Sequence, residues 1–359
     1  MKEIIYRGAI NSLSFGNVSY NLMREMYKSG IKVSFFPFGD KLDFSAFDKI
    51  DEDFKQWVVS SSQERFNTVD KEMPCLTQWH INGSENKIGK SQTLFTFHET
   101  DEVTSVEKSI VNLQDACVFS SNHSKKIFQS RGCQNVSSAS IGFDQDFEST
   151  GEEYLPDKIH FGLMGKFEKR KQTGEILKAW VKKYGNDYRY QLSCCINNPF
   201  FKPDQMNQII AQTLDNKVYG NVNFLPHLKT NSEVNEFLNA IDIDLTGLSG
   251  AEGWNIPAFN STALGKWSIV MNHTSHKDWA TNKNSILIEP DSSDEIYDGS
   301  FFIKGHIFNQ GNMNFITEDK MINAFETAEK KCKSINKEGL KLQEKFTYSK
   351  TLKQLLKTL

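Results

Sequence analysis

The sequence predicts an α/β protein with two doubly wound domains, and three observations support this fold class. Short apolar runs alternate with segments of helical period along the whole chain, which is typical of parallel strands covered by helices on both faces. The 359 residues are enough for two domains of ordinary size, each with its own core. A polar, acidic stretch at 145–158 divides the alternation into two series.

The first series predicts a domain over residues 1–150. Its first helix is indicated by Val18, Leu22, Met23 and Met26, which share one helical face. The apolar runs predicted as strands are 4–9, 31–36, 76–79, 94–97, 116–120 and 136–140.

The second series predicts a domain over residues 151–339. Its predicted strands are 159–164, 190–194, 222–225, 241–245, 268–271 and 286–288. Doubly wound domains bind ligands at the carboxyl ends of their strands, so two such domains place a site in the cleft between them.

A lysine-rich segment with leucines at helical spacing predicts a C-terminal helix at about 340–359. We expect its leucines to pack back on the first domain while its lysines face water. The alternative is a basic amphipathic helix that touches an anionic membrane surface from the cytoplasmic side.

Composition argues against several classes of protein. The net charge is −3, so no strong positive field favours nucleic acid as a partner. Six cysteines without C-x-x-C spacing argue against a disulfide framework or a zinc site and favour reduced thiols in the cytoplasm. No run approaches the roughly 20 apolar residues of a membrane span, and the first residues lack the apolar stretch of a secretory signal.

The strongest functional signal is the stretch LSGAEGWNIPAFN at 248–260. A strand-like run precedes it, and a helix opens with Pro257, which suits a first helical turn because it has no N–H to satisfy. Free backbone N–H groups and the positive end of this helix would face a ligand in the loop. The loop can bind a phosphate through its backbone N–H groups, and the carboxylate of Glu252 can bind the hydroxyls of a sugar. The pattern therefore predicts a nucleotide-sugar site.

This loop resembles that of GT-B glycosyltransferases of the retaining family 4, whose motif reads S-x-x-E-G-F-G-x-P-x-x-E. The matching positions are Ser249, Glu252, Gly253, Trp254, Pro257 and Asn260. The resemblance implies GT-B architecture, in which two Rossmann-like domains face each other across a cleft. It also implies a retaining glycosyltransferase whose first domain receives the acceptor and whose second domain binds the nucleoside-diphosphate sugar.

The resemblance also implies roles for single residues. Glu252 would lie near the hydroxyls of the donor sugar and take part in catalysis. Asn260 stands where the family has a ribose-binding glutamate, and its amide can bond a diol but lacks the charge that strengthens such bonds. The residues implied around the donor sugar and ribose are Gly253, Trp254, Asn255, Ile256 and Asn260.

A second block follows the predicted strand 159–164. The family has Gly-Arg there and a lysine six residues after the glycine, and Gly165, Lys166 and Lys171 match these positions, with lysine in place of arginine. Two cations would stabilise the charge that develops on a leaving diphosphate without a metal ion. The alternative for this block is an ordinary basic turn.

The first half of the chain offers further candidates. His98 ends a predicted strand where the family often has His-Asp or His-Glu, which implies an imidazole near the donor sugar or the reacting centre. Gly16 and Asn17 lie where the family has a glycine-rich loop near the donor phosphate, but the loop is not the G-x-G-x-x-G of a dinucleotide-binding protein. The segment 79–83 fits the acceptor side, or equally a packed tryptophan with a turn.

These observations favour transfer of a sugar to a hydroxyl acceptor, which is a glycan, a lipid-linked sugar or another alcohol. We expect no cofactor and no obligatory metal, because no Asp-x-Asp pair lies next to the donor loops. Asp242 and Asp244 have this spacing, but they alternate on a strand that we expect to be buried. One alternative is a catalytically weak or silent GT-B protein that binds a nucleotide sugar or glycan as a recognition module, motivated by Asn260 and the sparse glycine loop. Another is a transferase acting on DNA bases, which the balanced charge disfavours.

Overall fold

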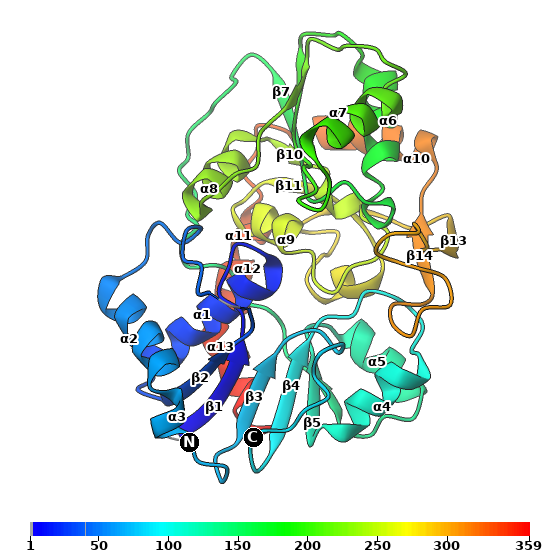
Figure 1. Cartoon of the computed structure of the whole chain (residues 1–359). Coiled ribbons are helices and arrows are strands. Elements are labelled where there is room, and N and C mark those ends of the chain that lie inside the picture. Colours follow the sequence, from blue (N-terminus) through cyan, green and yellow to red (C-terminus); the bar gives the residue numbers. More distant parts are fainter. Residues whose placement is uncertain (1–2, 40) are drawn as a thin grey trace.

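The computed structural model describes residues 3–39 and 41–359. Within these residues lie two parallel sheets of six strands each and one antiparallel hairpin. The strand orders are β2-β1-β3-β4-β5-β6 and β12-β11-β10-β7-β8-β9. In Figure 1 the strands of the lower sheet run upward toward the second domain. The predicted fold class, two doubly wound α/β domains, is confirmed.

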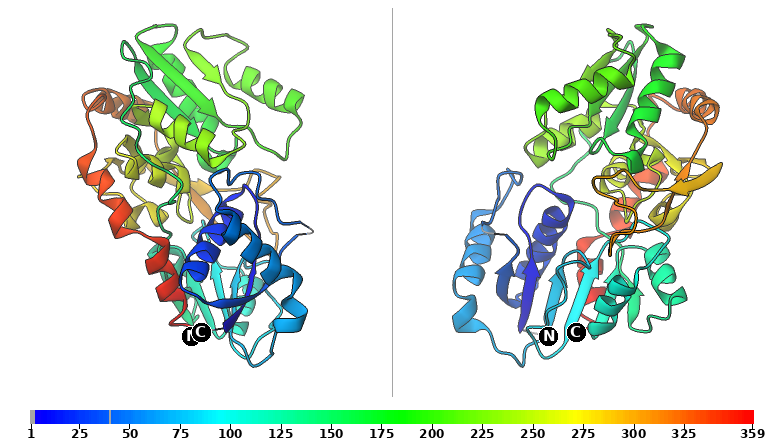
Figure 2. Two further views of the ribbon diagram at one scale, coloured as in Figure 1. Left: turned by 90° about the vertical axis from the view of Figure 1, so that its left-hand side faces the viewer. Right: turned by 45° about the vertical axis from the view of Figure 1, so that its right-hand side comes forward.

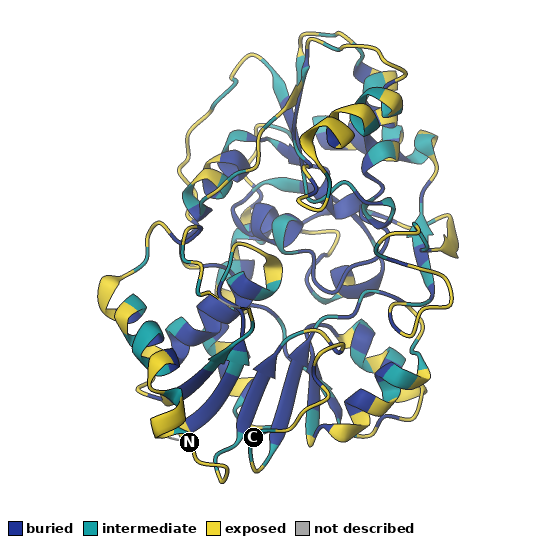
Figure 3. Ribbon diagram, in the orientation of Figure 1, coloured by how far each residue is buried: buried dark blue, intermediate teal, exposed yellow. Residues whose placement is uncertain are grey.

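The first domain contains the strands β1 (Glu3–Gly8), β2 (Lys32–Pro37), β3 (Cys75–Gln78), β4 (Gln92–Thr96), β5 (Ala116–Phe119) and β6 (Val136–Ser138). Its helices are α1 (Ser14–Lys28), α2 (Glu52–Gln63), α3 (Arg65–Thr68), α4 (Ser105–Leu113) and α5 (Asn122–Ser130). The apolar face predicted for the first helix is fully buried against the sheet. Figure 3 shows the strands almost entirely buried and the exposed residues on the outer sides of the helices.

The second domain contains the strands β7 (Ile159–Met164), β8 (Tyr190–Cys195), β9 (Val222–Phe224), β10 (Ile243–Asp244), β11 (Trp267–Met271) and β12 (Ile286–Ile288). Its helices are α6 (Thr173–Tyr184), α7 (Pro203–Thr213), α8 (Asn231–Ala240), α9 (Ile256–Ala263) and α10 (Glu318–Glu329), with short 3-10 turns η1 (Lys169–Lys171), η2 (Thr246–Leu248) and η3 (Thr274–Asp278). All twelve strands predicted from sequence are present, each within two residues of its predicted ends.

The hairpin of β13 (Ser292–Glu295) and β14 (Asn312–Phe315) was not predicted. The loop that joins its strands, residues 296–311, reaches the first domain and is called the crossing loop here. Its neighbour Asn312 donates its backbone N–H to Asp101 Oδ1 at 2.7 Å, and Asn309 donates to Glu107 Oε1 at 2.9 Å. Phe308 enters an apolar cluster of the first domain. The crossing loop therefore connects the two domains through contacts beside α4 (Figure 1).

The C-terminal segment returns to the first domain through α11 (Lys337–Leu340), α12 (Leu342–Lys345) and α13 (Tyr348–Leu355). Helix α13 packs on α1, and the left view of Figure 2 shows this segment descending along the first domain. Leu352 and Leu355 are buried, whereas Lys350 and Lys353 are exposed, so the leucines pack on the protein. Among the helices of the described residues, we find none with the length and apolarity needed to cross a bilayer.

Candidate functional site

Five charged side chains form a continuous chain at the carboxyl end of β7. Lys166 Nζ lies 3.1 Å from Glu168 Oε1, and Glu168 Oε2 lies 3.2 Å from Arg170. Arg170 also lies 3.1 Å from Glu252 Oε2, and Lys171 donates to Glu252 Oε1 at 2.7 Å. We call Lys166, Glu168, Arg170, Lys171 and Glu252 the charge chain. It joins the two blocks that the sequence singled out separately.

Glu252 is ionised although it is buried. Its side chain is 8% exposed, and burial alone would raise its pKa. Lys171 and Arg170 outweigh burial and hold the pKa of this carboxyl well below its usual range. Burial likewise disfavours the charge of Arg170, but Glu252 and Glu168 raise its pKa above the ordinary value. Glu252 and Arg170 are therefore buried ions that stabilise each other's charged form.

Arg170 was missed in the sequence analysis. It lies in the run Lys169-Arg170-Lys171, which forms the 3-10 turn η1. This turn directs Arg170 into the protein, where it also donates to the carbonyl of Ala251, while Lys169 caps carbonyls near the hairpin. The only sequence signal for Arg170 was the run of three cations, and this run does not indicate which of the three side chains is buried.

The loop after β10 is held by specific hydrogen bonds. Asn255 adopts the left-handed conformation with φ +67°, and its amide donates to the carbonyl of Thr246 and lies 2.9 Å from His276 Nε2. Helix α9 then begins at Ile256, with Pro257 in its first turn as predicted. Gly250 donates to the carbonyl of Arg170 at 2.8 Å, which locks this loop to the charge chain.

Two residues predicted at the donor side lie in the interior. The ring of Trp254 is 2% exposed and packs against Phe259 and Phe346, so it contacts the core and not the cleft. Asn260 is 3% exposed on α9, and its Oδ1 has no hydrogen-bond partner among the described residues. Trp254 thus links the loop to the C-terminal segment.

His98 follows β4 and approaches the loop of the second domain. A Cβ added to Gly253 would lie 2.9 Å from Phe97 Cβ and 3.4 Å from the backbone nitrogen of His98. Glycine at position 253 therefore permits the close approach of the two domains here. Ser120 donates to the carbonyl of Gly253 at 2.7 Å. The imidazole of His98 is buried, which lowers its pKa and keeps it neutral, and its Nδ1 has no partner among the described residues.

Gly16 and Asn17 make contacts that shape the first loop and join the domains. A Cβ on Gly16 would lie 2.4 Å from the Asn11 carbonyl oxygen, so only glycine lets this loop close. Asn17 Nδ2 lies 3.5 Å from Asn231 Oδ1 on α8 of the second domain. In the second domain, Gly165 has φ +131°, and Lys171 packs beside it.

Asp242 and Asp244 do not form a pair. Burial raises the pKa of Asp244 to about 6, and Asp242 lies 3.1 Å from Lys333. No group of three potential metal ligands occurs in the part of the chain that the structure describes.

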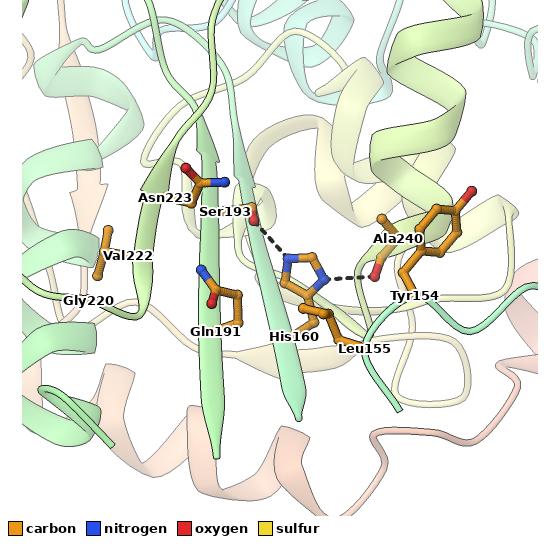
Figure 4. Close-up of a pocket in the computed structure, with 9 residues that line it drawn as sticks. All are labelled: Tyr154, Leu155, His160, Gln191, Ser193, Gly220, Val222, Asn223 and Ala240. Atoms are coloured by element: carbon orange, nitrogen blue, oxygen red, sulfur yellow. Dashed lines mark hydrogen bonds between the residues drawn. The ribbon is translucent and has the colours of Figure 1, made fainter. Parts of the chain in front are cut away.

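A hollow of about 490 Å³ lies on the second sheet, and Figure 4 shows the residues that line it, none of which belongs to the charge chain. It is lined by Tyr154, Leu155, His160, Gln191, Ser193, Gly220, Val222, Asn223 and Ala240. The two ring nitrogens of His160 lie 2.8 Å from the Ala240 carbonyl and from Ser193 Oγ. His160 is fully hydrogen-bonded and is the second residue of β7. This hollow is therefore not the predicted site, which lies at the carboxyl ends of the strands.

No protein-family model matches the chain, and no curated protein sequence matches it. Solved structures match it along its whole length. Sucrose-phosphate synthase from Thermosynechococcus elongatus superposes with a TM-score of 0.72 at 10% identity, covering 99% of this chain and 98% of that one. Anabaena HepE in complex with UDP-glucose gives 0.66 at 11% identity over 100% and 99% of the two chains. The protein has the GT-B fold. A trehalose-phosphate synthase (UDP-forming) from Burkholderia vietnamiensis gives 0.65 at 9% identity over 99% and 98%.

The GT-B fold predicted from the loop motif is thereby confirmed, because three independent GT-B structures cover both domains. In a GT-B protein the carboxyl ends of the two sheets face each other. In this chain, the packing of Gly253 against Phe97 brings the loop that carries Glu252 to the end of β4, where His98 lies.

Proposed function

We propose that this GT-B protein is a retaining glycosyltransferase that moves a sugar from a nucleoside-diphosphate sugar to a hydroxyl acceptor. The observation that carries the proposal is the charge chain, in which a buried, ionised Glu252 is held between Lys171 and Arg170 beside a helix N-terminus. The likeness to HepE, a structure in complex with UDP-glucose, supports a nucleotide-sugar donor.

In the proposed reaction, the bond between the anomeric carbon and the diphosphate oxygen breaks, and its electron pair leaves with the diphosphate. The acceptor oxygen forms the new bond to the same carbon on the same face, and its proton passes to the diphosphate. Lys166 and Lys171 stabilise the charge that develops on the leaving group. Glu252 accepts hydrogen bonds from hydroxyls of the donor sugar and so orients it.

The charge balance of the chain favours an anionic ligand. Three cations and two carboxylates leave a net charge of +1 in a largely buried setting. Lys171 is more exposed than Glu252, at 14% against 8%, so a diphosphate can reach it while Arg170 still neutralises the carboxylate. We infer that the reaction needs no metal ion, because these cations occupy the role that a metal would fill.

Other parts of the proposal rest on single observations. Asn260 is proposed for the ribose on its motif position alone, because its unpartnered Oδ1 is buried and the residue is 3% exposed. The unpartnered Nδ1 of His98 is proposed for the donor sugar or the reacting centre, since His98 lies beside the loop that carries Glu252. All six cysteines are free thiols, which agrees with a reducing cytoplasm.

The test is thermal stabilisation of the protein by a panel of nucleoside diphosphates and their sugars. A ligand at 100 times its Kd adds about 2.7 kcal/mol of stability. We expect Lys171→Ala to abolish the shift and Glu252→Ala to weaken it for the sugar forms. Lys178→Ala, an exposed lysine on α6, is the matched control and should leave the shift unchanged.

Nucleotide release without acceptor separates this proposal from the alternative of a silent recognition module. Slow release that depends on Glu252 supports an enzyme. Binding without any release favours the module, and no shift with any nucleotide contradicts the transferase proposal.

A further inference from the structure

Four aromatic side chains gather at the edge of the first domain that faces the second. Phe38 follows β2, Phe15 opens the helix after β1, Trp79 follows β3 and Phe97 follows β4. The order of these strands in the sheet is β2-β1-β3-β4, so the four rings come from segments that follow four neighbouring strands. We call these four residues the aromatic row.

The rings are in contact along the whole row. Phe38 stacks on Trp79 with centroids 4.5 Å apart, and Trp79 lies 5.7 Å from Phe15. Phe15 in turn lies 4.4 Å from Phe97. All four rings are only partly buried, whereas about half of the aromatic residues of this chain are buried in the core. A partly exposed, contiguous aromatic surface of this kind marks a binding site more often than a core.

One end of the row reaches the proposed donor site. Phe97 is the residue against which Gly253 packs, next to Glu252. The exposed His80 lies against Phe15 with ring centroids 4.1 Å apart, and it is close enough to Glu99 and to Lys166 of the charge chain to feel the charge of both. Polar groups of both domains therefore border the rings at this end.

The other end of the row, at Phe38, borders a second hollow on the surface of the first domain. The guanidinium of Arg7 lies 4.9 Å from the centre of the Phe38 ring. A hollow of about 310 Å³ continues from there. It is lined by Arg7, Phe36, Pro37, Phe38, Val69 and Ile88. The surface is thus longer than a single sugar ring would need.

We propose that the acceptor is an oligosaccharide whose rings lie along the aromatic row, with the hydroxyl that receives the sugar at Phe97. A sugar ring has an apolar face of C–H groups and a rim of hydroxyls, which matches aromatic faces bordered by His80 and Glu99. A lipid chain would instead call for an aliphatic channel, and the aliphatic residues at this surface, Val69 and Ile88, line the hollow beyond Phe38 and not the end of the row at Phe97. This inference rests on the proposed function and narrows its acceptor to one class.

The test uses the full chain, an array of defined oligosaccharides and the nucleotide-sugar panel. The best oligosaccharide is titrated alongside its own shorter fragments. We expect affinity to rise with the number of sugar units in the wild-type protein. Trp79→Ala and Phe38→Ala should weaken oligosaccharide binding about tenfold while changing nucleotide-sugar binding by less than about twofold.

Two controls guard against an effect on folding. Trp79→Phe keeps an aromatic ring and should restore most of the affinity. Tyr188→Ala removes a ring that is 65% exposed in the second domain and should change neither ligand.

The outcomes separate the two proposals. If the protein binds a nucleotide sugar but no oligosaccharide, the acceptor inference alone is overturned. The same holds if it binds both ligands and Trp79→Ala leaves oligosaccharide binding unchanged. Oligosaccharide binding that depends on Trp79 without nucleotide binding overturns the transferase and keeps the row as a glycan site. Binding of neither ligand overturns both.

Discussion

The ammonium of Lys171 and the carboxylate of Glu252 are 2.7 Å apart, although 81 residues separate them in the sequence. One residue follows β7 and the other follows β10, and these strands are neighbours in the second sheet. The contact therefore exists because parallel strands bring their carboxyl ends to one edge. It couples the stability of the domain to the group that we propose holds the donor sugar.

Loss of the Glu252 carboxylate should destabilise the protein. Glu252→Ala leaves Arg170 and Lys171 buried without their counter-charge, which we expect to lower the free energy of unfolding by about 3–5 kcal/mol. Urea denaturation measures this loss. The double variant Glu252→Ala with Lys171→Met should lose less than the sum of the two single variants, and strictly additive losses would contradict the coupling.

Acid should destabilise the protein through His273. Burial and the neighbouring His276 lower the pKa of His273 to about 3, and its Nε2 donates to the Ser249 carbonyl. Because the folded pKa is below the unfolded value of about 6.5, the unfolded chain takes up a proton first as the pH falls below 6.5. The His273 contribution to this loss is about 2 kcal/mol at pH 5.

Denaturation curves at pH 7.5 and pH 5 test this contribution. His273→Gln should have a smaller difference between the two pH values than the wild-type protein, even if the variant is less stable at both. An equal difference would show that His273 does not carry the effect.

Trp254 should contribute to stability and not to donor affinity. Its ring is enclosed by Phe259 and Phe346, so Trp254→Phe should cost about 1–2 kcal/mol of unfolding free energy while the Kd of a nucleotide sugar stays unchanged. Calorimetric titration alongside denaturation measures both quantities. If Trp254→Phe instead raised the Kd of the nucleotide sugar and left the free energy of unfolding unchanged, Trp254 would belong to the donor site.

The crossing loop should restrain the first domain. Phe308→Ala removes a ring that is 8% exposed in the cluster with Ile81 and Leu94, and we expect a loss of about 3 kcal/mol. Amide hydrogen exchange should rise in α4, which this loop covers. Ile307→Ala, in which the removed side chain was 53% exposed, should leave that exchange unchanged.

Much of this architecture could be predicted from the sequence because buried parallel strands are continuous apolar runs, as in β7 and β11. The hairpin was not predicted because all four residues of β13, Ser-Ser-Asp-Glu, are polar and exposed, so this strand has no apolar pattern. Its pairing depends on hydrogen bonds to β14 and on the anchor at Asp101, which only the folded chain brings together.

The site was predicted less completely than the fold. The motif marked Glu252 and Lys171, which the structure brings together, but periodicity could not separate Arg170 from the two lysines beside it. Trp254 was assigned to the donor side because its motif position is next to Gly253. Its burial follows from Phe346, which arrives from the C-terminal segment 92 residues later and covers the ring.

The return of the C-terminal segment has a consequence for synthesis on the ribosome. Helix α1 is complete early, yet the surface that α13 covers stays bare until Leu352 and Leu355 emerge. At typical elongation rates of about 5–20 residues per second, the roughly 320 residues between α1 and Leu352 take about 16–65 s. The apolar surface of α1 that α13 covers is therefore exposed while the second domain is synthesised. During this interval a chaperone could bind that surface. Stalled nascent chains ending before and after α13 should differ in protease resistance at α1.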